Sequence, residues 1–493
     1  MKDQLYKSFV SYVKYAKPYL RQKFPVPKEG DQKIRIAHID RSFWLRSICK
    51  NIEGSREFNN LVSDFSVACG GKPVKKVEKG SWVSMEQNAI QNFFRRSKLY
   101  LKIAEGKSIN IDNYFEQLCS AFNERQVKVI RLWLLDSVYF SESIIDFGNF
   151  KIQRFSKEEL DALVDNQLNH IFYPFAELGT DILSHYWFIR EESSENIKGI
   201  DYVIPISFDE VFRVPRNFPD RVIQLLALFD WEEVGIGGYQ DKFDEHAGWE
   251  AFSTPIAIGI TDNVFASPHP SPDLSKLEFF PFPTGPDGEI VEGPQFYHHI
   301  GKGQLERLKE IVEKSQEFLQ SIDLKECNWE FLDIAMGYLA KAFFAEGLEQ
   351  LLWHMTVLEA LFGEKNKVME PIRKRLGYIF GKTNKERKAI GNKFDELYDF
   401  RSGLVHGNKY EKRAYWGHLR EARKLARKSL LWFLTYLSAI HQELAREQKP
   451  LRDYPKKEEI QTMLDFNKEA LQRIGFLIEK LPMNFPNINI WGN

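Results

Sequence analysis

Apolar residues recur at three- and four-residue steps through most of the chain after residue 304. This period is typical of helices that bury one face, so it predicts helices at about 329–344, 348–362, 386–405 and 412–443. A shorter basic helix is expected at 368–380. Since consecutive amphipathic helices joined by short connections bury their apolar faces against one another, we expect a helical bundle with its own core.

The N-terminal part of the chain mixes two patterns. Helical spacing predicts helices near residues 5–13 and 85–103. Further on, β-branched and aromatic residues predict a strand at 127–135 and a hairpin at 144–152 that turns at Gly148-Asn149. The other elements expected in this part are strands at 186–189, 202–206 and 256–260 and a helix at 219–229.

A section rich in Pro and Gly at 268–286 predicts loops and marks where strand character ends. The fold class expected from these patterns is α+β, with a mixed α/β N-terminal region followed by an all-α bundle. The expected domains are an N-terminal region at 1–303 with a subdivision near residue 125, a helical linker at 304–327, the bundle at 328–445 and a C-terminal tail at 446–493.

Composition limits the classes of protein to which this chain can belong. Its 493 residues are 43% apolar, which is enough for two or three domains with cores of their own. The four cysteines show no C-x-x-C spacing, which argues against a disulfide framework and a thiolate zinc site. The N-terminus is charged where a signal peptide is apolar, and the longest apolar stretch, 430–440, is shorter than the ~20 residues that span a bilayer. We therefore expect a cytoplasmic protein that does not enter a membrane.

Charge is distributed unevenly along the chain. Residues 365–428 contain 19 Lys and Arg and 7 Asp and Glu, a net charge of +12, whereas the whole chain carries −1. A basic stretch on an otherwise acidic chain is typical of a domain that binds a polyanion such as a nucleic acid. The alternative is a solvated helical surface, because Lys and Arg are good helix formers.

The residue that fits its surroundings least is Arg401. The apolar stripe of the helix expected at 386–405 runs through positions 390, 394, 397 and 404, and Arg401 lies in its middle. A guanidinium keeps its charge when buried, so it needs an anionic partner or a polar cleft there. His406 lies just before Gly407, where the helix is expected to end and its dipole favours a protonated imidazole.

Two interpretations of this pair follow from the spacing. Either Arg401 and His406 act on a phosphodiester, or Arg401 pairs with a carboxylate such as Glu359 while His406 only caps the helix. On a regular helix the five-residue step separates the two side chains by about 140°. An active site therefore requires either that the helix ends near Gly403 or that two chains together complete the site.

Other motif-like fragments lack the context that their chemistry needs. Gly381-Lys382-Thr383 lacks the preceding strand and the earlier Gly of a phosphate-binding loop. His298-His299 has no local carboxylates with which to complete a metal site. The sequence contains no nucleophile or zinc-protease signature, so we expect neither a metal nor a cofactor.

The segment at 397–407 resembles the signature of HEPN domains, in particular the Apea-like group. That family carries an R-x4-6-H motif, with a polar residue after the Arg, on a helical bundle. Residues 357–363 resemble the family's second helix, and residues 372–377 resemble the element that follows it. The resemblance covers residues 328–445, while the first 300 residues are only loosely similar to the variable regions found beside such domains. The segment that carries it reads Leu397-Tyr398-Asp399-Phe400-Arg401-Ser402-Gly403-Leu404-Val405-His406-Gly407.

The resemblance implies a metal-independent endoribonuclease that cuts single-stranded RNA at the interface of two HEPN domains. His406 would be the acid or base, Arg401 the ligand of the phosphate and of the transition state, and Ser402 their polar support. Attack of the ribose 2′-OH on the neighbouring phosphorus would leave a 2′,3′-cyclic phosphate and a 5′-OH. The residues expected to bind substrate around this site are Arg373, Arg375 and Asn408.

The same resemblance implies a homodimer that binds RNA through its HEPN domains. The N-terminal region would sense an unknown activating ligand or protein and restrain the nuclease, as in prokaryotic anti-phage defence or toxin effectors. Two other functions stay open. One is a non-catalytic HEPN module that binds RNA or a protein partner. The other is an independent enzyme in the N-terminal region, where we find no acid–base or metal constellation.

Overall fold

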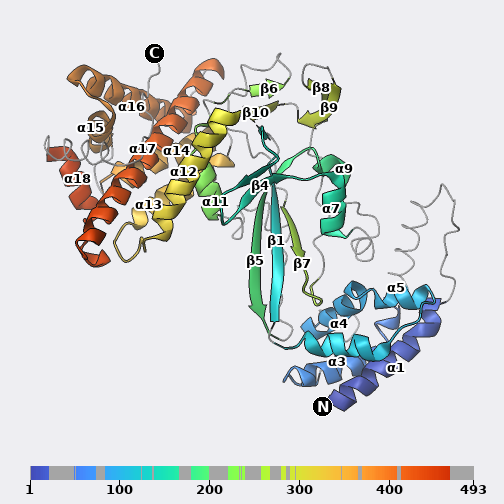
Figure 1. Cartoon of the computed structure of the whole chain (residues 1–493). Helices are drawn as coiled ribbons and strands as arrows, with labels where there is room; N and C mark the ends of the chain where they lie inside the picture. Colours follow the sequence, from blue (N-terminus) through green and yellow to red (C-terminus); the bar gives the residue numbers. More distant parts are fainter. Residues whose placement is uncertain are drawn as a thin grey trace. The chain divides into compact units, whose positions relative to one another are not determined.

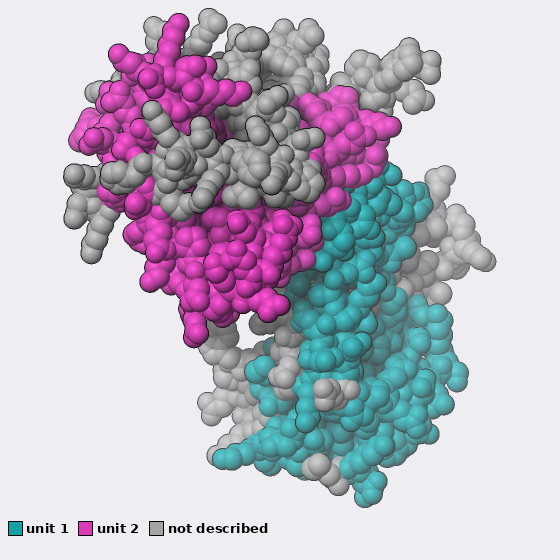
Figure 2. Space-filling model, turned by 60° about the vertical axis from the view of Figure 1, so that its left-hand side comes forward, with its two compact units in different colours: residues 1–134, 143–216, 255–277 teal, residues 135–142, 217–254, 278–493 magenta. Residues whose placement is uncertain are grey.

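The computed structural model of this chain divides into two compact units (Figure 2). The first contains residues 1–134, 143–216 and 255–277, and the second contains residues 135–142, 217–254 and 278–493. The units are interleaved along the sequence, so the domain boundary expected at residue 303 lies inside the second unit. The residues that the structure describes are 2–21, 49, 51–73, 84–123, 125–135, 138–165, 179–198, 220–231, 234, 236–238, 257–266, 279–284, 289–294, 296–345, 347–364, 369–407 and 412–466.

The first unit opens with a group of helices. They are α1 (Lys2–Arg21), α3 (Arg56–Ala68), α4 (Met85–Arg96), α5 (Leu99–Ala104) and α6 (Ile111–Ser120) (Figure 1). The side chains of Ser55, Ser84 and Asn110 each accept a backbone hydrogen bond from the first turn of the helix they precede, which fixes where α3, α4 and α6 begin. The single helix expected at 85–103 is two helices, because the chain turns at Lys98, whose φ is +56°.

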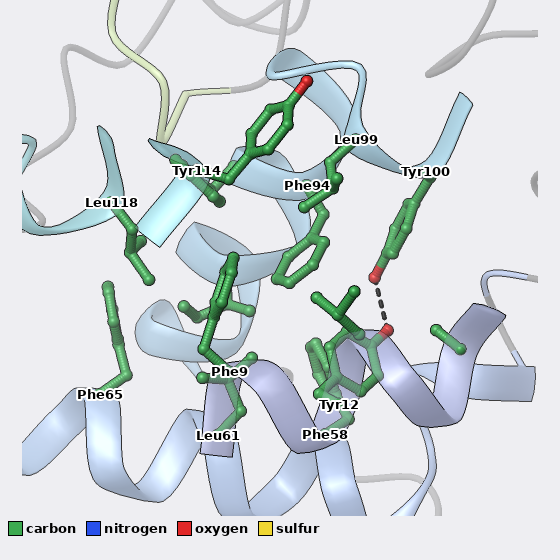
Figure 3. Close-up of a cluster of buried hydrophobic side chains, with 14 of the residues drawn as sticks. Phe9, Tyr12, Phe58, Leu61, Phe65, Phe94, Leu99, Tyr100, Tyr114 and Leu118 are labelled. Carbon is green, nitrogen blue, oxygen red and sulfur yellow. Dashed lines mark hydrogen bonds between the residues drawn. The ribbon is translucent and has the colours of Figure 1, made fainter. Parts of the chain in front are cut away.

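Aromatic side chains fill the core of these helices (Figure 3). The rings of Phe9 and Tyr12 on α1 lie 5.4 and 5.2 Å from the ring of Phe94 on α4. The hydroxyl of Tyr12 forms a buried hydrogen bond of 2.6 Å with the hydroxyl of Tyr100, so each of these groups has a partner although neither reaches water. Phe265, which follows the last strand of the sheet described below, is buried in the same core.

A buried ion pair lies beside this aromatic core. Nη2 of Arg95 contacts the two carboxylate oxygens of Glu53 at 3.0 and 2.9 Å, and Glu53 is only 5% exposed. Burial raises the pKa of Glu53 to about 7, although Arg95 acts in the opposite direction. The Glu53 carboxyl group therefore gains or loses its proton near neutral pH, and the net charge of the Glu53–Arg95 pair changes with it.

Strands replace helices from Arg125 onward, close to the subdivision expected near residue 125. The strands β1 (Arg125–Leu135), β3 (Ile144–Asp146), β4 (Lys151–Arg154), β5 (Trp187–Ile197) and β7 (Ala257–Thr261) form a sheet in the order β3-β4-β5-β1-β7. The short helices α7 (Lys157–Val164) and α9 (Thr180–Leu183) lie between β4 and β5 in sequence.

The expected hairpin is confirmed, with β3 and β4 antiparallel and Gly148 at a φ of +81° in the turn. The strands expected at 127–135, 186–189 and 256–260 are also confirmed. The strand expected at 202–206 lies outside the described residues.

Two small sheets belong to the second unit. β10 (Phe296–Ile300) pairs with β2 (Val138–Phe140) in parallel and with β6 (Ile236–Gly238) antiparallel, and β8 (Phe279–Thr284) pairs antiparallel with β9 (Glu289–Pro294). The expectation that strand character ends in the Pro/Gly-rich section was therefore wrong. Pro281 and Pro283 are two residues apart in β8, and alternate residues of a two-stranded ribbon turn their backbone nitrogens away from the partner strand. Neither proline has to break a ladder hydrogen bond.

The rest of the second unit is helical, as the apolar pattern predicts. Its helices are α11 (Asp220–Leu226), α12 (Lys302–Gln320), α13 (Glu330–Phe343), α14 (Gly347–Phe362), α15 (Met369–Phe380), α16 (Asn384–Val405), α17 (Lys412–Arg446) and α18 (Lys457–Phe466), with a 3-10 turn at Leu451–Asp453. The expected helices from 329 to 443 and the helix expected near 219–229 are confirmed, and the fold class is α+β. No helix in the described ranges is long and apolar enough to cross a membrane.

The segment expected as a linker at 304–327 is part of the folded unit. α12 buries Leu305, Leu308 and Val312, and α11 packs against both α12 and α13. The ring of Trp231, just after α11, lies 6.2 Å from the ring of Phe343 on α13. The helical bundle is therefore completed by residues that precede the expected boundary by more than 70 positions.

Candidate active site

The candidate site lies at the C-terminal end of α16. The helix begins at a capping box in which Thr383 and Glu386 satisfy each other's backbone N–H groups. It runs through Gly403 to Val405, so the alternative in which the helix ends near Gly403 is wrong. His406 is the C-cap, and Gly407 follows at a φ of +86°, which confirms the expected glycine terminator.

Arg401 lies on the buried side of α16, as its place in the apolar stripe predicts. Its side chain is 26% exposed, and its Nη1 lies 3.7 Å from Oε1 of Glu359 on α14. Its Cζ lies 5.5 Å from the ring centroid of Tyr398, one turn earlier on α16. The ion pair that we considered as an alternative role for Arg401 is thus present.

This ion pair leaves the guanidinium incompletely paired. A separation of 3.7 Å is longer than the ~2.8 Å of a charge-assisted hydrogen bond, so Glu359 balances the charge of Arg401 without accepting a hydrogen bond from it. The Nε of Arg401 is buried and has no hydrogen-bond partner among the described residues. Because a buried Nε is closed to an incoming oxyanion, the capacity that Arg401 keeps for one lies in its terminal amino groups, which form no hydrogen bond with a described residue.

His406 occupies a different face of the same helix end. Its side chain is exposed, and its backbone N–H donates to the carbonyl of Ser402 at 3.0 Å. Because α16 is regular through Val405, His406 is rotated by about 140° from Arg401 but only about 40° from Ser402. One chain brings Ser402 and His406 to a common face and directs Arg401 elsewhere.

The three residues expected to bind substrate have different surroundings. Arg373 is 45% exposed, and its guanidinium contacts Asp395 at 3.1 Å and Asn392 at 3.2 Å. Asn408 lies outside the described residues.

The third residue, Arg375, is buried and fully engaged. It is 1% exposed and contacts Asp465 Oδ2 at 2.6 Å, the carboxylate of Glu364 and the backbone carbonyl of Phe362. A substrate-binding role does not fit this burial, and we assign Arg375 to the structure of the bundle. No local pattern indicates this burial, because its partner Asp465 lies 90 positions away in the chain.

Sequence reasoning also missed a polar layer between α14 and α17. Arg423 is 2% exposed and donates from Nη2 to Oε1 of Gln350 at 2.7 Å. His354 is fully buried in the same unit, and burial together with the charge of Arg423 holds its pKa well below the usual range. The signal was available, since Arg423 is four residues from Leu419 and so shares the buried side of its helix.

Buried cations reduce the positive charge that the bundle shows to solvent. Arg375, Arg423, Arg427 and Lys428 are 1%, 2%, 1% and 6% exposed, and all four belong to the +12 stretch at 365–428. The surface of this stretch is consequently less basic than its sequence suggests. Among the described residues, no three His, Cys, Asp or Glu side chains form a group that could hold a metal ion.

Comparison with known proteins does not add a relative to this description. No protein-family model, no curated protein and no solved structure matches the chain. The HEPN resemblance rests on the segment at 397–407 and on its helical context.

Proposed function

We propose that this chain is a metal-independent endoribonuclease that cleaves single-stranded RNA at a composite site of a HEPN-type dimer. The observation that carries the proposal is the state of Arg401, a half-buried guanidinium whose carboxylate partner Glu359 lies 3.7 Å away, too far to accept a hydrogen bond from it. Arg375, which belongs to the structure of the same bundle, differs in that its Nε and both terminal amino groups are hydrogen-bonded.

The proposed chemistry uses three groups. His406 accepts the proton of the ribose 2′-OH as its oxygen bonds to the neighbouring phosphorus. Arg401 stabilises the negative charge that develops on the non-bridging oxygens, and a protonated imidazole donates to the departing 5′-oxygen. The bond from phosphorus to that oxygen breaks, which leaves a 2′,3′-cyclic phosphate and a 5′-OH. Ser402, on the face of His406, supports the pair with its hydroxyl.

A second copy of the chain explains the angular separation of the two residues. Arg401 and His406 of one helix are about 140° apart and do not meet at one phosphate. Two copies of α16 facing each other would supply Arg401 and His406 to both sides of one RNA strand. The two imidazoles would then divide the roles of base and acid between them.

A regulatory role for the remainder of the chain completes the proposal. An unrestrained ribonuclease would damage the RNA of its own cell, so we assign the first unit to sensing an activating ligand or protein. Such a protein would act in the cytoplasm as a toxin or anti-phage effector. The sensing role of the first unit presupposes the nuclease function, so it can be tested only once RNA cleavage has been demonstrated.

The direct test is cleavage of single-stranded RNA by the purified full-length protein in excess chelator. We expect cleavage by the wild type and a rate about 100-fold to 1,000-fold lower for Arg401→Ala, the range seen when one donor to a developing oxyanion is removed. His406→Ala should lose a factor of at least ~100. The matched control is Arg452→Ala, which removes an equal charge from a side chain that is 81% exposed.

Three results would contradict parts of the proposal. If Arg401→Ala and His406→Ala both retain cleavage, the assignment of the active site is wrong. If the chelator abolishes cleavage, the metal-independent mechanism is wrong. If sedimentation shows that the protein is monomeric at the concentration at which it cleaves RNA, the proposal of a site shared by two chains is wrong.

The second candidate function is a non-catalytic HEPN module that binds RNA or a protein. The Arg401–Glu359 ion pair favours it, because an arginine with a carboxylate partner needs no substrate to explain it. Folded wild-type protein that binds RNA yet leaves it intact under all triggering conditions would establish this function. A double-mutant cycle with Arg401→Ala and Glu359→Gln would then measure the pair as a structural contact.

A further inference from the structure

Exposed positive charge is concentrated where α15 turns into α16. Lys382 lies in the connection, and Lys385 and Lys388 follow on the first turns of α16, all three exposed. None of them forms an ion pair with a described residue. We name these three lysines, together with Arg387 and Tyr378, the α15–α16 basic surface.

Glu386, the acidic residue nearest to these lysines in sequence, forms no ion pair with their side chains. Oε2 of Glu386 accepts the backbone N–H groups of Lys382 and Thr383 at 2.7 and 3.1 Å, as part of the cap of α16. These hydrogen bonds lower the pKa of Glu386, so the carboxylate is committed to the backbone. The lysine ammonium groups beside it remain available to an anion.

Arg387 is held in place by the close approach of the two helices. A Cβ at Gly377 would lie 3.0 Å from the carbonyl oxygen of Arg387, and a Cβ at Gly381 would lie 2.7 Å from its backbone nitrogen. Both positions therefore need glycine for the helices to pack this closely. The Nε of Arg387 donates to the carbonyl of Gly381 at 3.0 Å, and its Cζ lies 5.0 Å from the ring centroid of Tyr378.

This arrangement leaves one end of the guanidinium open. The two terminal amino groups of Arg387 donate to no group in the described part of the chain, although Nε is fixed and the ring of Tyr378 restrains the plane. A planar fork of two parallel donors matches two oxygens of one phosphate. Because the side chain is already oriented, less conformational entropy is lost when it binds.

We propose that the α15–α16 basic surface binds the phosphate backbone of single-stranded RNA. Arg387 binds one phosphate through its terminal amino groups, and Lys382, Lys385 and Lys388 bind neighbouring phosphates. The ligand class rests on the proposed ribonuclease function, which makes RNA the substrate. Arg387 precedes Arg401 by 14 helical residues, so the two guanidinium groups are separated by about 21 Å along α16. The surface therefore holds RNA at a distance from the bond that is cut and favours substrates long enough to reach both places.

The test uses binding and cleavage separately. Lys382→Ala/Lys385→Ala/Lys388→Ala removes three exposed charges, and Lys7→Ala/Lys14→Ala/Lys17→Ala removes three exposed charges from α1 as the matched control. Binding of a labelled 20-nucleotide RNA is measured by fluorescence anisotropy in a His406→Ala background, so that the RNA stays intact. For three lost phosphate contacts, the slope of log K against log salt concentration should become shallower by about 2 in the first variant and stay constant in the control.

Arg387→Lys tests the fork, since it keeps the charge but not the paired donors. We expect it to weaken RNA binding, with hydrogen exchange of α15 and α16 as the check that the fold is intact. The His406→Ala background slows cleavage, so these binding measurements report on RNA that is still intact. With His406 restored, the triple lysine variant should lose kcat/KM on the 20-nucleotide RNA and retain it on a dinucleotide.

The outcomes separate this proposal from the proposed function. An unchanged salt slope in the triple lysine variant overturns the binding surface, whatever the protein does to RNA. A wild type that binds RNA through these lysines but never cuts it overturns the nuclease and leaves the surface. Equal binding of duplex DNA or of a polyglutamate peptide, with the same loss in the variant, overturns the assignment to single-stranded RNA.

Discussion

Substituting Arg375 with Ala tests whether this deeply buried charge of the bundle serves structure or substrate. Its guanidinium connects α15 to Asp465 on α18 and to the end of α14 through Phe362 and Glu364. The alanine variant removes every one of these contacts. It leaves the carboxylate of Asp465, which is 16% exposed, without its counter-charge.

The expected cost follows from the burial of the two carboxylates. Glu364 is 41% exposed and can be rehydrated with little penalty, whereas Asp465 is mostly buried. Removing one partner of a buried pair destabilises a protein by about 3–5 kcal/mol, and we expect the lower end because only one carboxylate is left in the interior. At 1.4 kcal/mol per factor of ten, 3 kcal/mol corresponds to roughly a 100-fold change in a local opening equilibrium.

Hydrogen exchange measured by mass spectrometry is the suitable assay, because the chain has two units and need not unfold in one step. Amides of α18 and of the C-terminal half of α15 should exchange roughly 100-fold faster in Arg375→Ala. Amides of α1 and α3 should be unaffected, and Arg452→Ala should match the wild type throughout. An Arg375→Ala protein with unchanged protection but weakened RNA binding would refute the structural assignment.

Three further substitutions have definite expected outcomes. Arg401→Ala should change the free energy of unfolding by less than ~1 kcal/mol in urea titrations, because its ion pair with Glu359 is long and partly exposed; a much larger loss would identify Arg401 as structural. Glu53→Gln should flatten the pH dependence of stability. The folded-state pKa of Glu53 is raised from 4.5 to about 7, so the wild type loses up to about 3 kcal/mol as pH rises through this window, and urea unfolding at pH 5 and pH 8 would show no such difference in the variant. Gly407→Ala should cost about 1 kcal/mol by thermal unfolding because an alanine is strained at a φ of +86°, and Gly407→Asn should cost less; equal melting of Gly407→Ala and wild type would contradict the cap.

The helices of the bundle were predictable because their buried faces repeat at the helical period. α13, α14 and α16 each begin and end within a few residues of the expected bounds. The break at Lys98 was not predictable from apolar spacing, since that spacing continues into α5. The strand with Pro281 and Pro283 was missed because its tolerance of proline depends on having one partner strand, which is a property of the sheet.

The candidate site was predictable in part for a similar reason. The position of Arg401 on the buried stripe and the cap at Gly407 are local features of one helix, and both are as expected. The burial of Arg375 depends on Asp465, which lies 90 residues away. The fixed position of Arg387 depends on the packing of α15 against α16, which the glycines at 377 and 381 permit. These are tertiary properties that a periodic pattern does not encode.

The interleaving of the two units has a consequence for how the chain can be divided by proteolysis. The chain passes between the units five times, at residues 134/135, 142/143, 216/217, 254/255 and 277/278. A cut near residue 303 would break the covalent link between α11 and the helices α12 to α18, although α11 packs against α12 and α13 and the ring of Trp231 contacts that of Phe343. No single cut of the chain therefore frees the complete second unit from all segments of the first, because each unit is assembled from segments that alternate along the sequence.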